Sequence, residues 1–150
     1  MISAGLIPFR FARDLEILIA HPGGPFWARR DVGSWSIIKG RLEGDEDPHQ
    51  AAAREFVEET GWDVPPGEWL ELGSITQRSG KQVMGYAVNA PDLDPDQLDP
   101  GHFTMRWHGR TRSFPEIDRV RWCTRSEAQR LLLAEQAPFF DRLADLMPPS

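Results

Sequence analysis

The stretch that decides the fold is GRLEGDEDPHQAAAREFVEETGW, residues 40–62. It predicts a helix over residues 48–60. Asp47 is a good N-cap, a proline stands at the first helical position, and Gln50 can close a capping box back to Asp47. Gly61 then supplies a left-handed stop, because glycine adopts a positive φ without strain.

Three glutamates of this helix, Glu55, Glu58 and Glu59, stand at i, i+3 and i+4, so their carboxylates lie on one face. Like charges at this spacing destabilise a helix by roughly 0.2–0.5 kcal/mol per pair, and the C-terminal half of a helix disfavours anions. A bound cation compensates both effects. Oxygen ligands, without a nearby His or Cys, indicate Mg²⁺ or Mn²⁺. The alternative is a solvated acidic helix face.

The other side of this helix is apolar and predicts packing against a sheet. The residues concerned are Ala52, Ala53, Phe56 and Val57. Arg54 lies about 100° around the helix from the next residue, and it can brace the carboxylates by a bidentate pair. The alternative for Arg54 is a solvent-facing arginine.

Outward from the helix, short apolar runs predict strands. They cover residues 2–10, 15–21, 35–39, 69–77, 82–89, 103–107 and 119–123. Turn residues at 13–14 and 79–80 predict two hairpins, while 26–32 and 90–101 are predicted loops.

Two more helices are predicted near the C-terminus. A capping box at Thr124 and Glu127 opens one that runs to about residue 135, and Pro138 opens another to about residue 146. The order of strands, helix, strands and helices predicts an α+β fold in which a mixed sheet lies between helices.

Length and composition predict one globular domain over residues 1–150. The chain is 40% hydrophobic and 27% charged, which is a globular balance. Its single cysteine, Cys123, excludes an internal disulfide and a CxxC metal site. No apolar run approaches the ~18 residues of a membrane span, and the first residues lack the pattern of a signal peptide. We therefore expect a cytoplasmic protein without a membrane partner.

The net charge of −6 is unevenly distributed. Residues 40–61 hold seven acidic residues and two arginines, whereas residues 101–130 hold seven arginines and three acidic residues. An acidic chain with a local arginine-rich face argues against general nucleic-acid binding, which favours a basic surface. Arginine forks suit phosphate and carboxylate, so a small anionic ligand remains compatible with this pattern.

The stretch at 40–62 closely resembles the Nudix box. That motif is a glycine, five residues, a glutamate, seven residues, Arg-Glu, a bulky apolar residue, any residue, Glu-Glu, any residue, a glycine and a bulky apolar residue. Every fixed position is present: Gly40, Glu46, Arg54, Glu55, Phe56, Glu58, Glu59, Gly61 and Trp62. Phe56 and Trp62 are aromatic where the family usually has aliphatic residues, which keeps the apolar requirement. The resemblance implies a Nudix-type α/β/α sandwich.

The resemblance also implies an enzyme. Nudix hydrolases cleave the pyrophosphate linkage of a nucleoside diphosphate joined to another moiety, such as an NTP, a diadenosine polyphosphate or an ADP-ribose-like molecule, by attack of water at phosphorus. Carried over, Glu58, Glu59 and the Gly40 carbonyl are ligands of Mg²⁺ or Mn²⁺, and Glu55 is a ligand or the base that activates water. Arg54 orients these glutamates and Glu58 shares the catalytic role, while Glu46 and Gly61 support the motif.

Residues outside the box are candidates for substrate contacts. Family members often recruit a further glutamate from a later loop, and Glu116 is the candidate here, against a plain surface acid. Lys39 can touch a phosphate or be merely solvated. The aromatic side chains Phe26, Trp27, Tyr86 and Phe114 can stack on a base, which contributes ~1–3 kcal/mol when realised, although aromatic residues more often belong to the core.

The sequence resembles a bacterial Nudix branch of predicted NTP pyrophosphohydrolases and, more loosely, the diadenosine-polyphosphate hydrolases. Ile38 and Arg41 stand where those relatives commonly have proline and glutamate. One alternative is a non-catalytic Nudix-fold module that senses a nucleotide, although such modules usually lose box glutamates. An isomerase on the same fold needs extra Cys and Glu residues, and Cys123 gives it little support. The expected partner is a small nucleotide, and a homodimer stays open.

Overall fold

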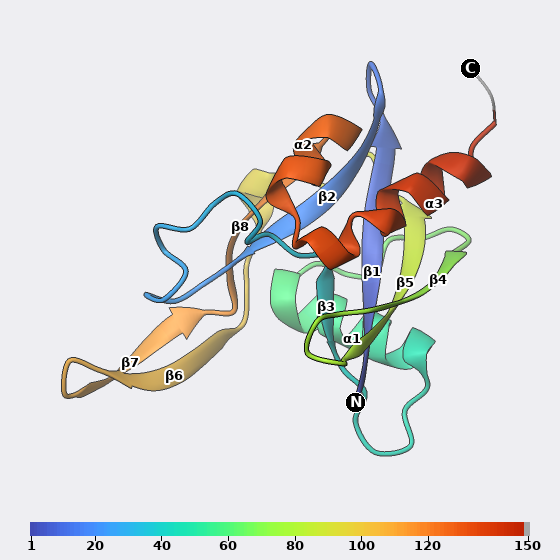
Figure 1. Cartoon of the computed structure of the whole chain (residues 1–150). Helices are drawn as coiled ribbons and strands as arrows, with labels where there is room; N and C mark the ends of the chain where they lie inside the picture. The colour runs from blue at the N-terminus through green and yellow to red at the C-terminus, as the bar shows by residue number, and fades with distance from the viewer. Residues whose placement is uncertain (149–150) are drawn as a thin grey trace.

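Three layers make up the computed structural model, which describes residues 1–148 (Figure 1). The middle layer is a mixed sheet of order β4-β5-β1-β2-β8, with β3 paired to β1. Its strands are β1 (Ile2–Phe11), β2 (Leu15–Pro22), β3 (Ile38–Arg41), β4 (Leu70–Thr76), β5 (Gln82–Asn89) and β8 (Ile117–Cys123). The outer layers are α1 (Pro48–Thr60) on one side and α2 (Arg125–Leu131) with α3 (Pro138–Leu146) on the other. Two 3₁₀ turns, η1 (Pro95–Gln97) and η2 (Ala134–Gln136), lie in the connections.

Alternation along β2 explains why the sheet is covered on both faces. Ile17 and Ile19 belong to the apolar cluster that includes α2 and α3, whereas Leu18 and Ala20 belong to the cluster that includes α1. Successive side chains of a strand point to opposite faces of the sheet, so a strand with a continuous apolar run must be covered on both faces. The predicted α/β/α sandwich is therefore confirmed.

Strand β1 is the centre of the sheet and places β3. It pairs antiparallel with β2 and β3 and parallel with β5. In this register Ala4 lies opposite Gly40 and Gly5 lies opposite Lys39. The start of the Nudix-like stretch is thus fixed to the most buried strand of the protein.

The caps of α1 set its ends where the sequence predicts them. The Asp47 side chain accepts a hydrogen bond from the Gln50 amide, and the Gln50 side chain accepts one from the Asp47 amide. Gly61 ends the helix with a φ of 75°. The predicted packing face is wrong at Val57, which is 42% exposed. Thr60 is buried instead, since it lies one turn after Phe56 and donates to the Phe56 carbonyl.

We expect Gly61→Ala to lower the free energy of unfolding by at least about 2 kcal/mol, because a left-handed alanine is strained and tight contacts add to the loss. A Cβ added at Gly61 would lie only 2.4 Å from the Asp99 carbonyl oxygen. Gly44→Ala is the matched control, since Gly44 also has a positive φ but has open space around it. Chemical denaturation measures both variants, and equal losses would contradict a role for the Asp99 contact.

Two predicted boundaries shift in the structure. The strand predicted over 35–39 is β3 at Ile38–Arg41, and Trp35 forms only an isolated bridge to Leu132. The helix predicted to run to about residue 135 ends at Leu131. Both shifts have one cause, because the amide of Trp35 donates to the Leu131 carbonyl and the amide of Leu133 donates to the Trp35 carbonyl. These backbone pairs replace the last helical turn.

A two-stranded hairpin projects from the body of the molecule (Figure 1). It consists of β6 (His102–Trp107) and β7 (Arg110–Pro115), and we call residues 102–115 the arm. The sequence predicts β6 but misses β7, whose polar residues lack an apolar alternation. The turn between them has two successive positive φ values, 52° at His108 and 77° at Gly109, as tight hairpins require. Across residues 1–148, no helix combines the length and apolar character needed to cross a membrane.

Candidate active site

A cleft of about 220 Å³ lies where the end of α1 meets the start of β8. Its wall is formed by Ala20, Pro22, Trp27, Ser34, Ser36, Ile37, Lys39, Glu59, Glu116, Ile117 and Leu133. The structure therefore brings together four residues that the sequence singles out from distant segments: Trp27, Lys39, Glu59 and Glu116.

Glu59 is a half-buried carboxyl group among like charges. Burial raises its pKa to about 8, and the nearby carboxylates of Glu55 and Glu116 push it in the same direction. Lys39 lies close enough to oppose this rise, but burial lowers the pKa of its own ammonium group. The wall of the cleft thus crowds carboxyl groups together, and Lys39 only partly offsets their mutual repulsion.

Glu55 packs directly against Gly40. A Cβ added at Gly40 would lie 2.0 Å from the carboxyl carbon of Glu55, so only glycine leaves room for this side chain. Burial raises the pKa of Glu55, although a hydrogen bond from Arg54 lowers it. This contact explains in physical terms why a glycine stands at the first position of the motif.

Arg54 ties the Nudix-like stretch together. Its Nε and Nη2 donate to the two carboxylate oxygens of Glu46 at 2.8 and 2.9 Å, a bidentate pair. Its Nη1 donates to Glu55 at 2.9 Å and to Glu58 at 3.2 Å. The hydrogen bonds hold the pKa of Glu46 below its usual range and raise that of Arg54. The bidentate pair therefore forms with Glu46 and not with the helix glutamates for which it was predicted, of which Glu55 and Glu58 each receive a single hydrogen bond.

The oxygen donors suit a hard cation in their chemistry. Glu55, Glu58, Glu59 and Glu116 supply carboxylates, and Gly40, which packs against Glu55, has a backbone carbonyl. In the part of the chain that the structure describes, residues 1–148, no three His, Cys, Asp or Glu side chains are grouped tightly enough to hold a metal ion as they stand. Because Arg54 holds Glu55 and Glu58, cation binding requires these side chains to turn.

The remaining aromatic candidates lie outside the wall of the cleft. Tyr86 is only 2% exposed, and its ring packs 4.2 Å from His49 and 5.6 Å from Trp69 beneath α1. It occupies a core position because β5 turns it toward the apolar cluster of α1. Phe114 lies on the arm, 6.0 Å from Phe103. Phe26 is 61% exposed beside Trp27.

Sequence reasoning missed the polar contacts that support the cleft. The side chain of Gln136 accepts from the Ile37 amide at 2.8 Å and donates to Ser36 at 3.1 Å. His21 is fully buried, and its ring nitrogens lie 2.9 Å from Asp118 and 2.6 Å from the Arg30 carbonyl. His21 thus fixes the loop that carries Trp27. No local spacing signals these contacts, because Gln136 and Asp118 lie about a hundred positions from their partners.

Comparison with known proteins identifies the family. The family model described as NUDIX domain matches residues 2–143. The chain belongs to the Nudix family. RNA pyrophosphohydrolase from Acidiphilium cryptum is 26% identical and covers 96% of this chain and 93% of its own length. CTP pyrophosphohydrolase from Escherichia coli is 30% identical and covers 81% and 76%. These names support the predicted class of enzyme, a Nudix hydrolase of pyrophosphate bonds.

A shorter similarity extends to a protein of another name. Octanoyltransferase from Myxococcus xanthus is 36% identical over 80 residues, half of this chain, but the chain spans only 22% of that protein. The similarity therefore covers only a segment of each protein.

Solved structures share the fold. The Ap4A hydrolase of C. elegans in a binary complex superposes with a TM-score of 0.64 at 19% identity, covering 95% of this chain and 96% of that one. The NUDIX domain of NrtR from Shewanella oneidensis, solved with ADP ribose, gives a TM-score of 0.62 at 14% identity and covers 98% and 88%. At these identities the likeness establishes the Nudix fold, and the fold prediction is confirmed.

Proposed function

We propose that this chain hydrolyses the pyrophosphate linkage of a nucleotide, with Mg²⁺ or Mn²⁺, in the cleft between α1 and β8. One observation carries the proposal: the half-buried carboxyl of Glu59 faces this cleft together with Glu116, Lys39 and Trp27. The acids in this wall can hold a metal bound to the phosphates. Lys39 can bind the phosphate charge that the metal leaves, and Trp27 can stack on the base.

The residues of the Nudix box have different roles in this proposal. Glu55, Glu58, Glu59 and the Gly40 carbonyl would hold the metal, which when bound neutralises charge on the phosphates and lowers the pKa of its water. Arg54 holds Glu55 in place and can release it to a ligand or base role. Catalysis of this type depends on positioning and electrostatic stabilisation, which fixed carboxylates and an arginine supply.

Two side chains outside the box orient the substrate. Lys39 is half-buried and fixed on β3, so its ammonium group can meet a phosphate with little rearrangement. Trp27 offers a ring that a base can stack on. The names of the relatives support a nucleotide: they refer to RNA, CTP and Ap4A, and the NrtR domain was solved with ADP ribose.

A substrate panel tests the proposal. The panel comprises CTP, diadenosine tetraphosphate and ADP-ribose, followed by phosphorus NMR in ¹⁸O-labelled water with Mg²⁺ or excess EDTA. We expect Mg²⁺-dependent cleavage, with the label showing which phosphorus water attacks. Glu58→Gln should lower kcat roughly 10²- to 10³-fold, as for other lost electrostatic groups. Glu68→Gln, an exposed glutamate outside the box, is the matched control.

Two outcomes overturn the proposal. Full activity in excess EDTA would refute the proposed requirement for a divalent metal ion. Tight binding of a panel nucleotide without any turnover would instead establish a nucleotide-sensing module.

A further inference from the structure

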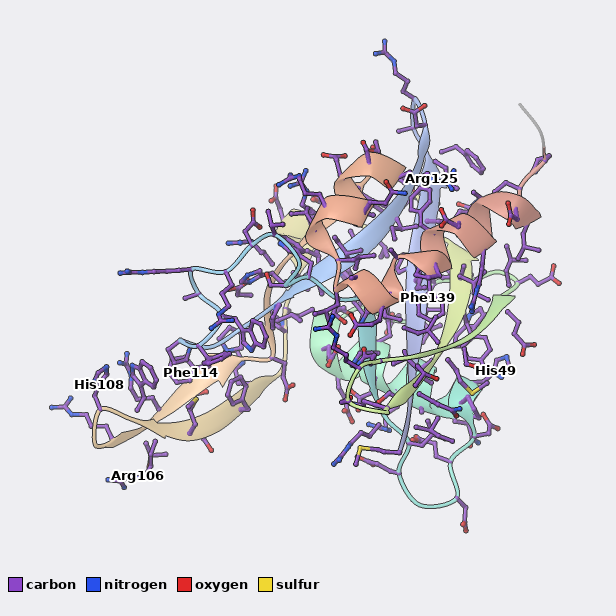
Figure 2. The ribbon with its side chains drawn as sticks, in the orientation of Figure 1. His49, Arg106, His108, Phe114, Arg125 and Phe139 are labelled. Carbon is purple, nitrogen blue, oxygen red and sulfur yellow. The ribbon has the colours of Figure 1, made fainter. Side chains whose placement is uncertain are left out.

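The two faces of the arm differ in chemistry. In the β6–β7 register, Phe103 pairs with Phe114, Met105 with Arg112 and Trp107 with Arg110. Directly paired residues point to the same side of a hairpin, and alternate pairs share a face. We call the face with Phe103, Met105, Trp107, Arg110, Arg112 and Phe114 the aromatic face. The opposite face holds Thr104, Arg106, Thr111 and Ser113. Figure 2 shows Phe114 and Arg106 on opposite sides of the arm.

The charge of the arm is opposite to that of the chain. Residues 102–115 contain three arginines and no acidic residue, in a protein of net charge −6. Arg110 and Arg112 are exposed, and among residues 1–148 neither forms an ion pair. The Arg112 guanidinium lies 5.8 Å from the centre of the Phe114 ring. Arginines interleaved with aromatic rings suit phosphates and stacked bases.

The base of the arm adjoins the cleft. Glu116, which lines the cleft, directly follows the last residue of β7, and its carbonyl accepts a hydrogen bond from the Gly23 amide at 3.0 Å. Phe103 packs so closely on Gly24 that an added Cβ would lie 3.1 Å from its ring. The aromatic face thus begins beside the loop that carries Trp27. A substrate chain that extends from the cleft past Glu116 can therefore lie along this face.

The length of the arm selects the kind of substrate. At about 3.4 Å per residue, a six-residue strand spans roughly 20 Å. A mononucleotide in the cleft can reach only the base of the arm, near Phe103 and Phe114. Trp107 and Arg110, at the far end, become useful only to an extended chain that carries several phosphates and bases.

We infer that the aromatic face of the arm binds a single-stranded nucleic acid whose 5′-terminal polyphosphate enters the cleft. This inference rests on the proposed function and names its substrate class. The overall acidity of the chain predicts no general nucleic-acid binding, but the local face differs in sign. Phe114 and Phe103 then stack on the nucleotides next to the cleft, and Arg112 and Arg110 bind the phosphates that follow.

Hydrolysis of 5′-triphosphorylated RNA of one, two and eight nucleotides tests this inference. In the wild type we expect kcat/KM to rise with chain length. In Arg110→Ser/Arg112→Ser, the ratio of kcat/KM for the eight-nucleotide chain to that for the mononucleotide should fall at least tenfold. The slope of log KM against log salt should fall by about 1.4, roughly 0.7 for each lost phosphate contact. Arg106→Ser is the matched control, because it removes the same charge from the opposite face, and its ratio should stay within threefold.

Binding separates this inference from the proposed function. If no substrate turns over, fluorescence anisotropy of the labelled eight-nucleotide RNA still measures binding of RNA by the arm. An affinity of the double variant at least tenfold weaker than that of the wild type supports the inference. A kcat/KM and an affinity that do not depend on chain length, or an equal loss in Arg106→Ser, would refute it. Analytical ultracentrifugation covers the remaining case: a dimer that the double variant dissociates, with RNA affinity unchanged, would make the arm an interface between copies.

Discussion

Glu59→Gln is expected to remove most of the turnover and, at the same time, to stabilise the metal-free protein. The turnover should fall roughly 10²- to 10³-fold, because a lost electrostatic group in a catalytic site has that effect. The stability should rise because glutamine removes a half-buried charge that lies beside Glu55 and Glu116. Each kcal/mol gained raises the Tm of a chain of this length by roughly 2–4 °C.

The stability gain should depend on pH in a defined direction. The pKa of Glu59 is raised from 4.5 to about 8 in the folded state, so the folded protein binds more protons than the unfolded one between these values. Stability therefore falls as the pH rises from about 4.5 to about 8. Thermal unfolding in EDTA should show little difference between wild type and Glu59→Gln near pH 4, and the full difference above pH 8.

Glu58→Gln is the matched control on the same helix. Its side chain is 59% exposed and contacts Arg54 at 3.2 Å, an interaction worth only a few tenths of a kcal/mol at roughly this exposure. Glu58→Gln should therefore lose turnover without gaining stability. Mg²⁺ should stabilise the wild type more than Glu59→Gln, because a ligand that binds only the folded state raises its stability. A Glu59→Gln variant that is less stable than the wild type in EDTA at pH 8.5 would contradict this account.

Local chemistry explains which parts of the structure were predictable. Helix α1 has its predicted ends because Asp47, Gln50 and Gly61 act on backbone groups within four residues. Strand β2 was predictable because its apolar run requires burial on both faces. Strand β7 was not, since the polar residues from Arg110 to Ser113 become a strand only by pairing with β6.

Spacing alone predicts the arrangement of the site only within one helix, whereas Trp27, Lys39 and Glu116 were candidates whose meeting in one cleft no spacing indicates. Spacing within the helix places Glu55, Glu58 and Glu59 on one turn, but their environments differ: Glu55 lies against Gly40, Glu58 is exposed, and Glu59 faces the cleft. Tyr86 was a candidate for base stacking but is buried, because an aromatic residue on a strand gives no sign of which helix will cover it. The order of the strands in the sheet decides the surroundings of the three glutamates and of Tyr86, and this order depends on contacts between distant segments.

The closeness of Gly40 and Glu55 leads to the second large effect. Gly40→Ala is expected to lower turnover about 10²-fold or more while leaving the fold intact, because the new Cβ must displace the Glu55 carboxylate. It would lie 2.0 Å from the carboxyl carbon and 2.3 Å from both oxygens, which are the far end of a flexible side chain. Gly40 also has no positive φ, so alanine suits its backbone.

Gly5→Ala on the neighbouring strand is the contrasting variant. There the added Cβ would lie 2.7 Å from the Ile38 carbonyl oxygen, a backbone atom that cannot move aside, so this variant should lose stability first. A double-mutant cycle then isolates the contact at the site. If Gly40→Ala acts through Glu55, combining it with Glu55→Gln should reduce kcat little further than Glu55→Gln alone, because the two changes disable the same group. Additive losses would show that Gly40→Ala acts independently of Glu55, and wild-type turnover in Gly40→Ala would contradict a role for the position of the Glu55 carboxylate.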